Sequence, residues 1–89
     1  MEHFETIWTN AEDFAKLHYS NTINISISKI KRELDILLSS KDQNEKIDCF
    51  GRILFDLCFI SNELNINVYI ALKNQLEELK MKTFDPPDE

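Results

Sequence analysis

The segment from Ile47 to Lys82 most constrains the fold, because it holds two long helical patterns separated by a few residues. The first pattern is apolar over most of its circumference. The second follows the short Asn-Ile-Asn sequence at 65–67 and repeats large apolar residues at three- and four-residue steps. No proline precedes Pro86, so nothing earlier in the chain breaks a long helix. The segment therefore predicts two helices joined by a tight turn.

The same helical spacing extends over the rest of the chain, which at 89 residues is long enough for one domain. Apolar residues recur at three- and four-residue steps in four stretches, and polar residues separate these stretches. The predicted helices cover residues 2–19, 26–40, 43–64 and 68–82. Residues 83–89 are predicted to form an acidic, proline-containing tail.

Polar residues at the start of each pattern predict how the helices begin and end. Isoleucines alternate within 23–27 as in a short strand, but helical spacing continues beyond them, so we expect a loop that enters a helix capped by Asn24 or Ser26. Asp42, with Glu45 three residues later, predicts a capping box at the start of the third helix.

The connection before the fourth helix contains two asparagines with separate expected roles. Asn65 is suited to the left-handed conformation that ends a helix, and Asn67 is suited to cap the next one. Short connections of this kind predict an all-α, antiparallel four-helix bundle. The residues that the fourth helix is expected to turn inward are Tyr69, Leu72, Leu76 and Leu79.

The third helix is too apolar to have one side in water, so we expect a homodimer, or a higher homo-oligomer, formed through it. Hydrophobic residues make up 43% of this short chain, which favours the same conclusion. The net charge of -6 argues against nucleic acid as a partner. The apolar runs are too short for a membrane span, and Cys49 and Cys58 are predicted to be buried free thiols, as in a cytoplasmic protein.

Two short segments carry a resemblance to a known family. Glu33 lies in the sequence RELDIL, and the sequence DCFGRILF begins at Asp48. This layout resembles the MazG-like, all-α nucleotide pyrophosphohydrolases, which carry an E-x-x-E motif on one helix and an E-x-x-D motif on the next. The resemblance covers residues 27–82 and includes Gly51, Leu54 and Phe55. It implies a Mg²⁺ site between two helices, where four carboxylates hold the ion that neutralises a triphosphate and helps to generate the attacking water.

The acidic part of the motif is mostly replaced in this chain. Glu33 matches the first acid, whereas the other three ligand positions hold Ile36, Cys49 and Arg52. Asn74 falls near an asparagine on the fourth helix of the family, which implies a nucleotide contact there. The resemblance therefore implies a degenerate metal site, and no metal or other cofactor is expected.

Arg52 brings a fixed positive charge to a position where the family binds a cation, so we hypothesise that it replaces the metal and pairs with Glu33. The alternative is a surface ladder in which Arg52 bridges Asp48 and Asp56, four residues away on either side. Asp56 lies among apolar residues, and we expect it to pair with Arg52 rather than to bind a displaced metal ion.

A few other residues have both a structural and a functional interpretation. Trp8 could stack on a nucleotide base, but its apolar neighbours favour a place in the core. His18 on the same helical stripe is expected to be a packing residue. Lys29, Lys31 and Arg32 form a basic cluster that could contact a phosphate, although such clusters usually form a solvated helix face.

Three functions remain open at this point. The first is a MazG-like protein with a degenerate metal site that acts by binding nucleotide or protein. The second is an active Mg²⁺-dependent nucleoside triphosphate pyrophosphohydrolase with a rearranged acidic site. The third is a small helical adaptor that docks a partner helix. The rearranged site would use Glu33, Asp35, Asp48 and Asp56.

Overall fold

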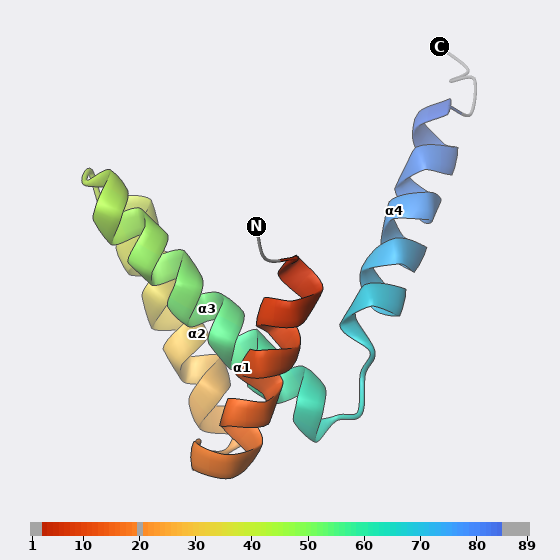
Figure 1. Cartoon of the computed structure of the whole chain (residues 1–89). Coiled ribbons are helices and arrows are strands. Elements are labelled where there is room, and N and C mark those ends of the chain that lie inside the picture. The colour runs from red at the N-terminus through yellow and green to blue at the C-terminus, as the bar shows by residue number, and fades with distance from the viewer. Residues whose placement is uncertain (1–2, 20, 85–89) are drawn as a thin grey trace.

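The protein folds into four α-helices, and the described residues, 3–19 and 21–84 of this computed structural model, contain no strand (Figure 1). The predicted all-α fold with four helices is therefore confirmed. The helices are α1 (Phe4–His18), α2 (Ile23–Ser39), α3 (Gln43–Glu63) and α4 (Val68–Phe84). The helix α4 thus extends into the segment expected to be a tail, and residues 85–89 of that tail lie outside the described part.

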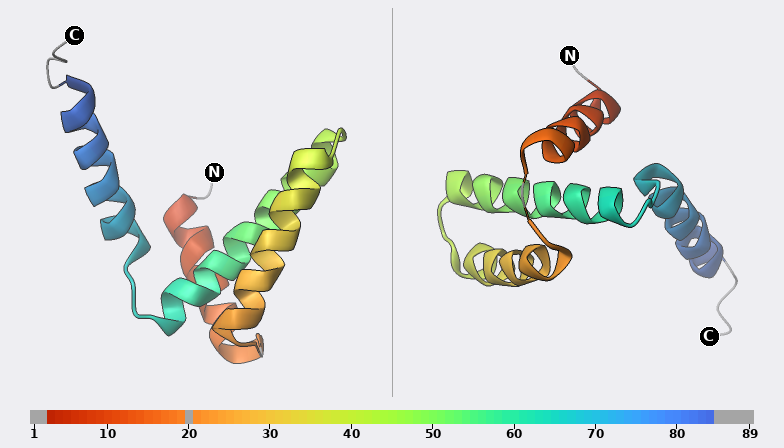
Figure 2. Two further views of the ribbon diagram at one scale, coloured as in Figure 1. Left: turned by 180° about the vertical axis from the view of Figure 1, so that it is seen from behind. Right: turned by 90° about the horizontal axis from the view of Figure 1, so that it is seen from below.

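The helix α3 is the centre of the fold, since α1 and α2 pack against it from opposite sides (Figure 2). The helices α2 and α3 form an antiparallel hairpin, and α1 crosses α3 near the C-terminal half of α3. The buried apolar residues are few, and they lie on α1 and α3: Trp8, Ala15, Cys49, Ile53, Cys58 and Phe59. Both cysteines are free and buried, as the sequence predicted.

The helix α2 begins earlier than expected, because Thr22 caps it. The Thr22 hydroxyl accepts a hydrogen bond from the backbone N–H of Ile25 at 3.3 Å. The prediction that Asn24 or Ser26 is the cap is therefore wrong, and the alternating isoleucines belong to the helix. Ser26 is instead fully buried within α2, where its hydroxyl accepts a hydrogen bond from the Asn21 side chain at 2.8 Å.

The predicted caps of α3 and α4 are confirmed. The Asp42 carboxylate accepts a hydrogen bond from the backbone N–H of Glu45 at 3.3 Å. The Glu45 side chain does not complete the box directly, because it accepts from the Ser40 hydroxyl, which in turn accepts from the Asp42 N–H. Asn65 has a left-handed φ of 57°, and the Asn67 side chain accepts from the third residue of α4 at 3.1 Å.

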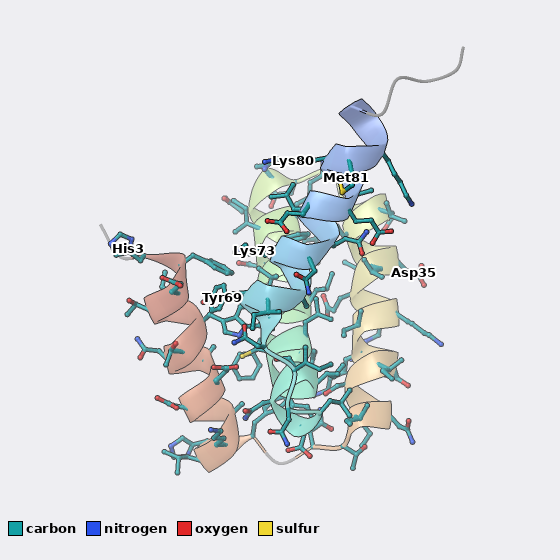
Figure 3. All side chains as sticks on the ribbon, turned by 90° about the vertical axis from the view of Figure 1, so that its right-hand side faces the viewer. His3, Asp35, Tyr69, Lys73, Lys80 and Met81 are labelled. Atoms are coloured by element: carbon teal, nitrogen blue, oxygen red, sulfur yellow. The ribbon has the colours of Figure 1, made fainter. Side chains whose placement is uncertain are left out.

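The helix α4 points away from the other three helices (Figures 1 and 2). It meets α3 at an angle of 105° across the turn that contains Asn65. The expectation that α4 packs inward is therefore wrong for the single chain, because Leu72, Leu76 and Leu79 are 66%, 50% and 50% exposed. Of the four residues expected to face inward, only Tyr69, at the base of α4 on the side of α1, is half-buried (Figure 3).

Tyr69 anchors the first turn of α4 near α1 and α3. Burial raises the pKa of its phenol, and the neighbouring Glu5, Glu12 and Cys58 act in the same direction. The helix beyond this anchor has no comparable burial among its described residues. The direction of α4 is thus set by the turn at Asn65 and by the burial of Tyr69, and not by a packed side of the helix.

None of the described helices is by itself long and apolar enough to cross a membrane. The helices α3 and α4 meet those limits of length and composition only when they are taken together across their bend.

The capping of α2 makes a testable prediction. Thr22→Ala removes the side-chain acceptor at the start of the helix and should lower the free energy of unfolding by about 1 kcal/mol. Asn24→Ala is the matched control, since Asn24 is exposed in the first turn, and it should change stability by less than about 0.5 kcal/mol. Urea denaturation followed by circular dichroism measures both. The opposite ranking would restore Asn24 as the cap.

Candidate functional site

A groove with a volume of about 770 Å³ lies between α2 and α3. Volumes of this order suit a bound small molecule. Charged side chains from both helices line it: Lys29, Arg32, Glu33, Asp48, Arg52 and Asp56. Tyr19, which follows α1, and the apolar residues Ile47, Gly51 and Phe55 of α3 complete the lining.

An ion pair between Arg52 of α3 and Glu33 of α2 spans the groove. The guanidinium Nε lies 3.0 Å from Oε1 of Glu33, and the same guanidinium donates a hydrogen bond to the Cys49 sulfur at 3.4 Å. The Glu33 side chain is 11% exposed and the Arg52 side chain 54%. The hypothesis that Arg52 pairs with Glu33 is confirmed. Three of the four ligand positions of the resembled motif therefore lie in direct contact.

The charges in this cluster follow from the pairing and from burial. The Arg52 guanidinium lowers the pKa of the Glu33 carboxyl below its ordinary value of 4.5, against the effect of burial. Burial, together with Glu33, raises the pKa of the Cys49 thiol above 9.0. At neutral pH the cluster thus contains a carboxylate, a guanidinium and a neutral thiol. A neutral, buried thiol is neither a nucleophile nor a metal ligand.

Asp56 is buried and is satisfied by residues from outside its own helix. The Tyr19 hydroxyl donates a hydrogen bond to the Asp56 carboxylate at 2.6 Å, and the Lys29 ammonium donates to the Tyr19 oxygen at 3.2 Å. The same ammonium lies 5.2 Å from the centre of the Tyr19 ring. This network joins the end of α1 to α2 and α3.

The predicted ladder along α3 is wrong. The ion pair of Arg52 in the described part of the chain is with Glu33, and the hydrogen bond described for Asp56 comes from Tyr19. Asp48 is exposed at the rim of the groove. The reason is that α2 brings a buried carboxylate within reach of Arg52, and a buried carboxylate requires a compensating charge more than an exposed one does.

Sequence reasoning did not single out Tyr19 as a site residue, because Asp56 lies 37 positions away on another helix. Each of the two residues nevertheless needs a hydrogen-bond partner that the other can provide. A carboxylate within the apolar sequence ILFDLCFI requires a donor, and a tyrosine at the end of an amphipathic helix requires a partner for its hydroxyl. Those requirements indicate that a partner exists, but they do not identify it.

Two residues with a possible ligand role are packing residues instead. Trp8 is buried between α1 and α3, which confirms its predicted place in the core. His18 is exposed, and its ring packs against that of Phe14 with ring centres 4.9 Å apart. It packs on its own helix and not, as a core residue would, on another one.

The remaining candidates do not line the groove. Asn74 lies on α4, outside it, and Lys31 is exposed on α2 beside the groove cations. Ile36 is half-buried on α2. Asp35 is exposed and points outward from α2 (Figure 3). The proposed rearranged acidic set is therefore divided between the groove and the outer surface.

The donor set for a metal ion is correspondingly sparse. In residues 3–19 and 21–84, no three His, Cys, Asp or Glu side chains lie close enough together to hold one ion. The groove instead offers cations to a ligand, because Lys29, Arg32 and Arg52 all line it. No family model, no curated protein and no solved structure matches this chain.

Removal of Arg52 should change the pH dependence of stability, because Arg52 is the largest cause of the lowered pKa of Glu33. In the unmodified protein the lowered pKa contributes stability above about pH 4.5, and this is lost as the pH falls through the folded-state pKa. In Arg52→Met the largest contribution that lowers the pKa of Glu33 is lost while burial still raises it, so the pKa of Glu33 moves upward. Acidification from about pH 7 to about pH 4 should then stabilise the variant relative to the unmodified protein.

The difference in Tm between Arg52→Met and the unmodified protein, measured across that pH range, tests this prediction. Glu33→Gln is the control, since it has no titrating group at this position and should remove the effect when it is combined with Arg52→Met. Parallel Tm profiles for Arg52→Met and the unmodified protein would contradict the role assigned to the ion pair.

Proposed function

We propose that this chain is a degenerate, non-catalytic relative of the MazG-like pyrophosphohydrolases that binds an anionic, nucleotide-sized ligand in the groove between α2 and α3. The observation that carries the proposal is the Arg52–Glu33 ion pair. The resemblance assigned both residues to a cation site between two helices, and they meet between those helices, together with Cys49. A guanidinium thus takes the place of a metal ion beside the remaining acid.

This replacement supports binding without hydrolysis. A guanidinium carries five N–H donors that suit phosphate oxygens, and the contacts to Glu33 and Cys49 use only part of them. Arg52 is half-exposed, so it can also face a ligand. A guanidinium does not lower the pKa of a bound water as a metal ion does. The chemistry that generates an attacking water is therefore missing, whereas the recognition of phosphate remains.

The lining of the groove suits both parts of a nucleotide. Arg32 and Arg52 offer positive charge to phosphates. Ile47 and Phe55 offer apolar surface to a base. The Asp56 carboxylate accepts a hydrogen bond from Tyr19, and the Lys29 ammonium bound to the same Tyr19 oxygen lies near enough to offset part of its repulsion of an anionic ligand. The volume of about 770 Å³ accommodates a ligand of this size.

The proposal includes a homodimer through α3. Large apolar side chains on one side of α3 are each at least 43% exposed: Ile47, Phe50, Leu57 and Leu64. A contiguous apolar surface of this kind is typical of an interaction site. It also favours the third function, a helical adaptor, if the surface that it meets belongs to a different protein.

A thermal-shift assay with a panel of nucleoside mono-, di- and triphosphates, with and without Mg²⁺, tests the function. We expect stabilisation by some nucleotides without Mg²⁺, and no pyrophosphate release with it. Mg²⁺-dependent pyrophosphate release would establish the enzyme instead. The adaptor would be favoured if no nucleotide shifts the Tm and a second protein co-purifies with the chain.

The groove cations predict which substitutions weaken binding. Arg32→Ala removes a cation from the lining and should weaken the binding of the most stabilising nucleotide by about tenfold. Lys31→Ala removes the same charge one residue away, outside the lining, and is the matched control. Titration calorimetry at fixed salt concentration measures both. Equal losses for the two variants would indicate general electrostatic attraction rather than a site.

A further inference from the structure

The chain exposes more surface than a folded monomer of its size. Its accessible surface is 7220 Å². A folded monomer of 10.5 kDa exposes about 5,400 Å². If the eight residues outside the described ranges are taken as fully exposed and are left out of both figures, an excess of roughly 600–800 Å² remains. A stable dimer of standard size covers about 800 Å² on each partner, so the excess matches one such interface.

One uncovered apolar strip lies on α4. Leu72 and Leu76 are exposed and continue the three- and four-residue spacing that begins at the half-buried Tyr69. The strip cannot fold back onto its own chain, because the turn directs α4 away from α1 and α3 (Figures 1 and 2). The 17 residues of α4 make a helix about 25 Å long, which is enough to cross another helix and its grooves.

The α4 of another copy is a poor partner for this strip. The positions that flank it on one side hold Lys73 and Lys80 (Figure 3). On the other side lies Lys82, which pairs with Glu78 of the same helix at 3.5 Å. Two such helices packed strip to strip would bring Lys73 and Lys80 of one copy close to lysines of the other copy, which disfavours that pairing. The strip therefore requires an apolar surface of another kind.

The chain carries such a surface on α3. An apolar groove of about 260 Å³ lies between α1 and α3. A second apolar groove, of about 470 Å³, lies between α2 and α3 and is distinct from the charged ligand groove of about 770 Å³. Gly51 and Leu54 line both grooves, so the grooves meet at these two residues. The other apolar lining residues include Ile7 and Ala11 of α1, Leu37 of α2, and Phe50 of α3.

No contact within the described part of its own chain requires glycine at position 51, where the two grooves meet. A Cβ at this position would meet nothing within 4 Å. Glycine inside a helix lowers stability relative to alanine, so its presence is not explained by the single chain. A glycine on an exposed helix face allows the backbone of another helix to approach closely. This indicates a helix that crosses α3 at Gly51.

We infer that α4 of a second copy crosses α3 at Gly51 and places Leu72 and Leu76 in the two apolar grooves. The contact is reciprocal, so each copy gives its α4 and receives the other one in an isologous dimer. One chain thus supplies both the uncovered strip and the surface that covers it. This inference rests on the dimer in the proposed function and specifies which helix of the partner covers α3.

Sedimentation equilibrium on the full chain and its variants tests the inference. The unmodified protein should have twice the mass of 10.5 kDa. Leu76→Glu buries a charge in the contact and should weaken dimerisation by about 100-fold or more, with helical circular dichroism retained. Met81→Glu is the matched control, because Met81 is 74% exposed and lies on the opposite side of α4. It should leave the dimer intact.

Gly51→Ala gives a second, independent measurement. If the chain acted alone, the substitution would stabilise α3 and leave the mass unchanged. With a partner helix at Gly51, we expect dimerisation to weaken by about tenfold or more, because the added methyl group separates the helices. A dimer contact that does not include Gly51 would not be weakened by Gly51→Ala.

The outcomes separate this inference from the proposals on which it rests. A monomer at all concentrations would overturn both the dimer and the crossing helix. A dimer that tolerates both Leu76→Glu and Gly51→Ala would overturn only the crossing helix. Nucleotide binding is measured separately on the unmodified protein, and its absence would overturn the charged ligand groove while leaving the crossing helix in place.

Discussion

The packing of α2 against α3 depends on the compensation of one buried carboxylate. Glu33 is taken out of water by the helix interface, and this would be unfavourable without the guanidinium of Arg52. The same contact fixes the polar character of the groove, because it keeps Glu33 ionised, whereas burial raises the pKa of the Cys49 thiol and keeps it neutral. The fold and the proposed binding site therefore have one electrostatic origin.

The local features of the fold could be predicted from the sequence because they depend on neighbouring residues. The start of α3 at Asp42, the start of α4 at Asn67 and the left-handed Asn65 each follow from a side chain and its own backbone. The cap of α2 was misassigned because several polar residues in a row can all cap a helix. The pattern alone did not rank Thr22 above Asn24.

Long-range features were predicted only where a motif linked distant residues. The pairing of Glu33 with Arg52 followed from a resemblance that placed both at one site. No motif linked Tyr19 to Asp56, so that hydrogen bond was missed. The direction of α4 was also missed, since periodicity identifies the apolar side of a helix but not what covers it. Gly51 lines the polar groove as well as both apolar ones, so the ligand site and the inferred dimer contact share a residue.

The network of Lys29, Tyr19 and Asp56 ties three helices together at one end of the groove. The opposite end, near the connection between α2 and α3, has no cross-link of this kind from α1 (Figure 1). The connection of residues 40–42 joins α2 and α3 at that end, so both ends of the groove are held, one by side chains and the other by the backbone. Ligands that differ in bulk would then be accommodated by movements of half-exposed lining side chains such as Arg52 rather than by separation of α2 and α3.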